Sequence, residues 1–184
     1  MEITNQRSET VSSTIITPQS TSSVENLSAD VMMQAFMIEE VNKKIDEVKT
    51  KLEMKTALLG AYGKQIGKLD MVRDKHPGGG DTKIYHTYER VDFTYDEKSG
   101  EVKEIKRGQL ATKDPIFGAK YTPKAALSAE IERLKKTEDK LKKEVSQLET
   151  DLKELLTRKK AMLEEVASGV TKKGNALKDL SMRT

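Results

Sequence analysis

The feature that most constrains how this chain can fold is a pair of long heptad repeats on either side of a shorter, different segment. In the first half, one apolar row recurs every seven positions, at Val31, Ile38, Ile45, Leu52, Leu59 and Ile66. In the second half, another row does the same, at Leu127, Leu134, Leu141, Leu148, Leu155 and Met162. Companion rows lie three or four residues away, so each tract places an apolar seam along one side of a helix. Such a seam must meet another helix.

The composition favours an elongated molecule. Hydrophobic residues make up 35% of the chain, charged residues 34% and aromatic residues 4%, which is too little apolar material for a thick globular core. The two tracts match in length, so the simplest arrangement folds the chain back on itself. The sequence therefore predicts a mainly α fold: a long antiparallel two-helix coiled coil with a small β-hairpin insert and a disordered N-terminal tail. The predicted units are a tail over 1–28, a first helix over 29–75, an insert over 76–122, and a second helix with a basic C-terminal tail over 123–184.

Serine and threonine dominate the predicted tail over residues 1–28. A segment with so few apolar side chains cannot bury enough surface to offset the entropy lost on ordering, so we expect it to be disordered. It lacks the charged start and the continuous apolar stretch of a cleaved secretory signal. No apolar run approaches the ~20 residues of a membrane-spanning helix, so we expect no membrane span.

The insert has a different character, because β-forming side chains alternate with polar ones over residues 91–95. This is the period of a half-buried strand, and residues 96–100 supply a turn before a return strand over 102–107. An isolated hairpin is marginal in water. We therefore expect its apolar face to dock on the helix ends, on the loop at 116–117 or on a neighbouring subunit. The aromatic residues predicted to form the surface of the insert are Tyr85, Tyr88, Phe93 and Tyr95.

Two charged residues interrupt the seams, Lys55 in the first tract and Glu138 in the second. With the chain folded back, they fall about one layer apart. A polar residue at a seam position commonly fixes register at a cost in stability, so one hypothesis is that Lys55 and Glu138 approach each other and set the register of the helical hairpin. The alternative is that each extends independently to solvent.

Apolar residues also gather toward the outer ends of the two tracts. Near the start of the first helix they are Met32, Met33, Phe36 and Met37, and near the end of the chain they are Leu177 and Leu180. Core packing at the open end of the hairpin is the simpler interpretation. The sharper one is a contact surface for assembly with a partner or with a sister subunit.

The sequence contains no pattern that indicates catalysis. His76 and His86 are the two histidines, and they do not have the spacing of helical metal ligands. The glycines of 78–80 follow a helix, which is the wrong context for a phosphate loop. Carboxylates such as Glu130 sit among lysines at helical spacing, as in a solvated helix surface. We therefore expect no cofactor, no metal site and no enzymatic activity.

Charge and cysteine content narrow the possible partners. The net charge is +3, and its basic residues are spread through glutamate-rich tracts rather than clustered, so we do not expect nucleic acid as a partner. The chain has no cysteine, which excludes disulfides and thiolate metal sites. This is compatible with a cytoplasmic location and with export through a channel that requires unfolding.

The layout resembles the extracellular filament and needle-tip proteins of bacterial type III secretion systems. The matching parts are the Ser/Thr-rich tail over 1–27, the helix that begins Val31-Met32-Met33-Gln34-Ala35-Phe36-Met37, and the helix over 123–167. The resemblance implies a secreted, self-assembling structural subunit at the bacterial surface, homo-oligomeric and served by a dedicated secretion chaperone. The β-hairpin insert departs from the filament proteins.

Two other classes share parts of this layout. Helix, β-hairpin, helix also resembles the prefoldin-type chaperone subunits, which would be cytoplasmic, although the insert is larger than one such hairpin requires and the tail is foreign to them. A structural or scaffold protein of a phage or other virion is the third possibility. The sequence therefore predicts assembly, but it leaves open the choice among a secreted filament or tip protein, a chaperone subunit and a virion protein.

Overall fold

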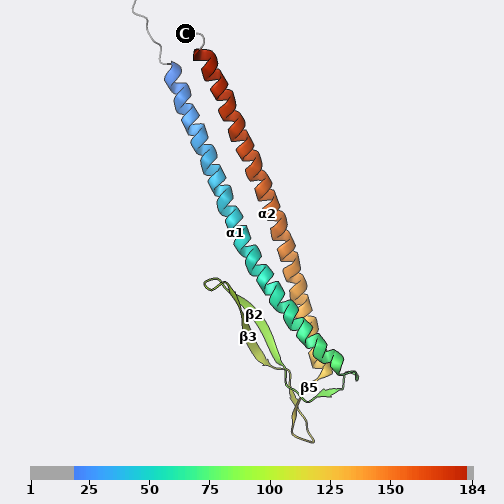
Figure 1. Cartoon of the computed structure of the whole chain (residues 1–184). Coiled ribbons are helices and arrows are strands. Elements are labelled where there is room, and N and C mark those ends of the chain that lie inside the picture. The colour runs from blue at the N-terminus through green and yellow to red at the C-terminus, as the bar shows by residue number, and fades with distance from the viewer. Residues whose placement is uncertain (1–18, 182–184) are drawn as a thin grey trace, which may run out of the picture.

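Two long helices dominate the computed structural model, which describes residues 19–181. Helix α1 spans Gln19–Lys75 and helix α2 spans Lys124–Ser181. They lie side by side, with the start of α1 beside the end of α2 (Figure 1). At 57 residues, α1 is about 85 Å long. The mainly helical fold with a small β insert is as predicted.

Both helices are longer than predicted. Helix α1 begins at Gln19, so residues 19–28, predicted as part of a disordered tail, are helical. Residues 1–18 of that tail lie outside the described residues. Helix α2 runs on to Ser181, through Gly169 and Gly174 and beyond the helix over 123–167 on which the resemblance was based. Extending a formed helix adds one hydrogen bond for each residue fixed, so a long helix continues through weak helix formers.

The insert contains the predicted hairpin and a second, small sheet. Strands β2 (Glu89–Asp96) and β3 (Glu101–Gln109) pair antiparallel, with Tyr95 opposite Val102. Gly100 has a φ of 71° in the turn, which a glycine adopts without strain. The second sheet has the order β1-β5-β4, formed by β1 (Lys83–Ile84), β5 (Lys120–Pro123) and β4 (Thr112–Lys113).

The second sheet was not predicted, because strands of two to four residues carry no readable alternation. Its buried centre is Thr122, which lies in β5. The Thr122 hydroxyl donates to the carbonyl of His86 at 2.9 Å and accepts from the amide of Tyr88 at 3.4 Å. This threonine therefore ties the last strand to the segment that leads into β2.

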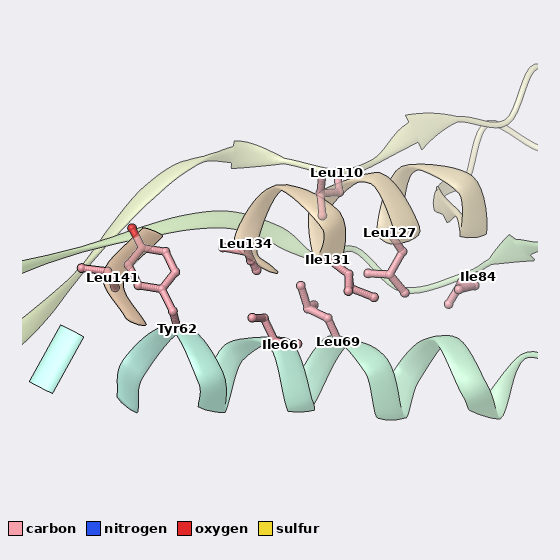
Figure 2. Close-up of a cluster of buried hydrophobic side chains, with 9 residues drawn as sticks. All are labelled: Tyr62, Ile66, Leu69, Ile84, Leu110, Leu127, Ile131, Leu134 and Leu141. Carbon is pink, nitrogen blue, oxygen red and sulfur yellow. The ribbon is translucent and has the colours of Figure 1, made fainter. Parts of the chain in front are cut away.

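The main hydrophobic core lies at the end of the helices nearest the sheets. Figure 2 shows Ile66 and Leu69 of α1 pointing toward Ile131 of α2. Leu127 and Leu134 of α2 are fully buried in the same cluster. Leu110 and Ile84 of the insert close it from the other sides (Figure 2). Toward the other end of the helices, the seam residues Leu148, Leu155 and Met162 are only half-buried.

The register between the helices differs from the one in which Lys55 and Glu138 approach each other. Lys55 pairs with Glu144, with a distance of 2.7 Å between Nζ and Oε2, and not with Glu138. Glu138 instead pairs with Lys142 on its own helix at 3.0 Å. It lies opposite Gly63, where an added Cβ would be 3.5 Å from the Glu138 carboxylate. Gly63 is eight residues from Lys55, or roughly two turns, so the predicted Lys55–Glu138 contact is wrong.

Charge reversal distinguishes the observed partner of Lys55, Glu144, from the predicted one, Glu138. Lys55→Glu should lower the free energy of unfolding by about 1 kcal/mol, because it places like charges opposite each other at a partly exposed site. Adding Glu144→Lys should restore most of that loss in urea denaturation followed by circular dichroism. The control is Lys55→Glu with Glu138→Lys, which should restore nothing. Equal recovery in both double variants would contradict this register.

Candidate functional site

Within residues 19–181, no three His, Cys, Asp or Glu side chains form a group that could hold a metal ion. No helix in this range is both long and apolar enough to cross a bilayer. The candidate functional features are therefore contacts and surfaces. Three of them stand out: a polar junction that holds the hairpin, a rigid loop at the sheet end, and an apolar surface at the other end.

The polar junction joins α2 to the β2-β3 hairpin through Arg133. Its guanidinium donates to the Asp92 carboxylate at 2.7 Å, to the Val91 carbonyl at 2.8 Å and to both carboxylate oxygens of Glu130, the shorter bond being 2.6 Å. Glu130 is only 2% exposed and also accepts from Arg90 of β2 at 3.0 Å. A buried carboxylate is tolerated only when it is paired in this way. The junction therefore fixes the hairpin at one angle to α2.

The charges in this junction reinforce one another. Hydrogen bonds to Glu130 and then to Asp92 raise the pKa of Arg133 above its usual range, outweighing burial. Burial raises the pKa of Asp92. Hydrogen bonds from Arg133 and Arg107 lower it by more than burial raises it, so the net shift of the pKa is downward. Glu130 is buried, so the prediction that it lies on a solvated helix surface is wrong. The spacing of Glu130 from Leu127 and Leu134, three and four residues, is the signal that places it on the buried face.

The hairpin docks on the helices rather than on the loop at 116–117. The rings of Phe93 and Tyr62 of α1 meet edge to face, with centroids 5.0 Å apart. Tyr88 and Phe93 pack against the main core. Tyr95 is half-buried near the hairpin turn, and Tyr85 is exposed. Of the four aromatic residues predicted for the insert surface, Tyr85 is therefore the one that is mostly exposed.

The loop between β4 and β5, which we call the tip loop (residues 114–118), is held by Asp114. One Asp114 carboxylate oxygen accepts from the amides of Ile116 at 2.8 Å and Phe117 at 3.2 Å, and the other accepts from Lys83 Nζ at 2.9 Å. The hydrogen bond from Lys83, followed by those from the two amides, lowers the pKa of Asp114 to about 2. The carboxyl group is thus a fixed anion that organises the turn.

The tip loop exposes its two largest side chains. Ile116 and Phe117 are each 77% exposed, although the turn that carries them is rigidly bonded. The loop lies at the sheet end of the molecule, beyond the helices (Figure 1). The loop at 116–117 was one predicted docking place for the hairpin, but both side chains are exposed and do not cover it.

At the opposite end, both helices expose apolar side chains. The exposed fractions of the predicted group Met32, Met33, Phe36 and Met37 range from 40% to 70%. The positions of Leu177 and Leu180 fall within α2, but their side chains lie outside the described residues. The predicted patch on α1 is therefore exposed within this chain.

A second exposed row lies on α2 and was missed. Leu156, Leu163 and Val170 recur every seven residues, one position after the seam residues Leu155 and Met162. Each is about half exposed. Two adjacent heptad rows are typical of a helix with two helical neighbours, and the sequence itself contained this signal. We call these three residues, together with Met33 and Phe36, the distal apolar surface.

Comparison of the chain with models of known protein families, with curated proteins and with solved structures gave no match.

The Asp114 anion predicts a specific acid sensitivity. Its pKa is lowered from 3.8 to about 2, so its contribution to stability is complete above pH 4 and is lost as the pH falls toward 2. Asp114→Asn should be less stable than the parent protein at pH 7, with the difference shrinking between pH 4 and pH 2. Thermal unfolding followed by circular dichroism across this range measures it. A difference that does not change with pH would contradict this role of the carboxylate.

Proposed function

We propose that this protein is a self-assembling structural subunit. In this proposal the two helices form an antiparallel coiled coil, and copies associate side by side through the distal apolar surface. The observation that carries it is the exposure of apolar residues on both helices at one end, with Phe36 at 63% and Leu163 at 47%. Burying these side chains against another copy would remove apolar area from water, which favours association.

The distribution of burial supports this proposal. The core near Leu69 and Leu127 is closed by the insert, whereas the far half of the helices has no third element to cover it among the described residues. Two paired helices leave much of each apolar surface in water. A second pair of helices supplied by another copy would bury Leu156, Leu163 and Val170 without any change of fold.

The exposed strand edges argue against assembly through the hairpin, as a prefoldin-type chaperone would require. Strand β3 carries charges of both signs, including Lys103, Glu104 and Lys106. Charged side chains on an edge strand oppose pairing with another strand. The helices are therefore the better candidates for contacts between copies.

Mass and shape across a concentration series test the assembly. Light scattering and negative-stain electron microscopy should show oligomers or filaments that grow with concentration. Phe36→Ser with Leu163→Ser should weaken association at least about tenfold, because each buried large apolar side chain contributes roughly 1.5–3 kcal/mol, while helicity is unchanged. The matched control is Met71→Ser, which is also 63% exposed but lies at the sheet end. A monomer at every concentration, or full assembly of the double variant, would overturn the proposal.

We further propose that the subunit is secreted, as the filament and needle-tip proteins that it resembles in layout are. The support is the Ser/Thr-rich, cysteine-free start of the chain. Residues 1–28 fused to a reporter should be exported by a bacterium with a type III system and retained when its export ATPase is deleted. A chain lacking residues 1–18 should keep its helicity by circular dichroism. Retention of the reporter in the intact strain would contradict export.

A further inference from the structure

The tip loop is built to present Ile116 and Phe117 in one conformation. Besides the carboxylate contacts, the Asp114 amide donates to the carbonyl of Ala119 at 2.7 Å, and the Gly118 amide donates to the carbonyl of Asp114 at 2.9 Å. Gly118 has a φ of 66°, which favours glycine. A loop with this many internal bonds loses little further entropy on binding. The two exposed apolar side chains are therefore preorganised for a contact.

The base of the same loop carries two lysines that face each other. Lys113 of β4 and Lys120 of β5 are direct cross-strand partners, and both are exposed. Like charges opposite each other on neighbouring strands are destabilising. Lys120 donates a hydrogen bond to Gln109, which is neutral. A partner with carboxylates beside an apolar site would relieve this repulsion and bury Ile116 and Phe117 together.

A groove of that chemistry exists on the same chain. It is about 630 Å³ in volume and lies between α1 and the turn of the β2-β3 hairpin. Met54 and Tyr95 contribute apolar surface, and Asp46, Glu47 and Glu97 contribute carboxylates. These three carboxylates are exposed and take part in no ion pair within residues 19–181.

The groove is not uniformly acidic, because Lys43 and Lys51 also line it. Each lies four residues from Glu47, a spacing at which opposite charges on a helix attract. Three carboxylates against two lysines still leave the groove one negative charge. Asp46 and Glu97 are then the carboxylates best placed to receive the lysines of the tip loop.

We propose that the tip loop of one copy inserts Ile116 and Phe117 into the groove of a second copy, with Lys113 and Lys120 against its carboxylates. A loop cannot fill the groove of its own chain, because the groove lies at residues 43–54 and α1 continues for about 21 residues, roughly 30 Å, before the sheet end. This contact joins two different surfaces, so it leaves one of each open on every pair and adds further copies into either a ring or an open chain of subunits. It rests on the proposed self-assembly and specifies one contact within it.

The same apolar and basic tip could meet an anionic membrane. A second copy is favoured as the partner, because the tip loop and the groove on the same chain have complementary chemistry. On a membrane, only two apolar side chains and two lysines of the loop would contact lipid. Stable anchoring at a membrane surface commonly needs a larger apolar area or a longer basic cluster. The membrane is therefore an alternative outcome of the experiment.

Engineered cysteines test the contact cleanly, because the natural chain has none. Pro115→Cys, which keeps both inserted side chains, and Thr50→Cys are made as separate proteins, mixed and mildly oxidised. Thr50 lines the groove. The matched control replaces Thr50→Cys with Glu53→Cys, an exposed residue of the same helix that does not line it. The Pro115–Thr50 pair should form a disulfide-linked heterodimer at least about tenfold faster than the control pair, because docking holds the thiols at millimolar effective concentration.

Charge reversal gives a second measurement that does not involve cysteine. Glu97→Lys with Asp46→Lys should weaken association, and Lys113→Glu with Lys120→Glu on the mixed-in partner should restore it. Equal cross-linking rates for the two cysteine pairs, or no restoration, would overturn this inference. If light scattering still detects oligomers, the proposed self-assembly stands without it. The parent protein is also tested for binding to phosphatidylserine vesicles. If it binds, if the Ile116→Ser/Phe117→Ser variant does not, and if cross-linking is not selective, the tip loop contacts a membrane and the inference of a contact between copies is overturned.

Discussion

The packing of Ile66 and Leu69 of α1 against Ile131 and Leu134 of α2 is the contact on which the rest of the structure depends. It closes the chain on itself next to the insert, where Leu110 and Ile84 complete the core. A two-helix structure has room for only one layer of such residues. The same constraint that builds this core near the sheets leaves the far half of both helices with apolar side chains in contact with water.

Polar contacts fix the angle of the hairpin and add a specific contact between the helices, which apolar packing along the seam does not determine. Arg133 and Glu130 set the angle of the hairpin on α2, and Lys55 with Glu144 joins the two helices farther along. Each carboxylate is partly or fully withdrawn from water and is matched by a cation, as burial of charge requires. The β2-β3 hairpin is therefore held against α2 by several hydrogen bonds. The groove beside Tyr95 gains a defined position relative to the helices, which a contact between copies needs.

The heptad rows and the alternation over 91–95 were sufficient to predict two long helices and a hairpin, because both periods reflect burial on one side of a regular element. Register was not predictable at the same level. A shift along the seam exchanges one apolar layer for another, and a carboxylate is available to Lys55 in more than one register, at Glu138 or at Glu144. The role of Asp114 was not predictable from the sequence, because it depends on the conformation of a loop and on Lys83, which is 31 residues away in sequence. The row at Leu156 and Leu163 was readable but was overlooked beside the stronger seam.

The central claim is that the two seams meet within one chain, and spin-label distances measure this directly. Lys51→Cys and Gln147→Cys border the same hollow between the helices, so labels at both sites of one molecule should lie close together. Pulsed electron paramagnetic resonance should give a narrow distribution of distances between the two spin labels, centred below about 25 Å. This is expected for helix axes roughly 8–10 Å apart and flexible linkers between the labels and the backbone. The short distance should persist when labelled protein is diluted into an excess of unlabelled protein. Its loss on dilution would show that the helices pair between chains and would contradict the account.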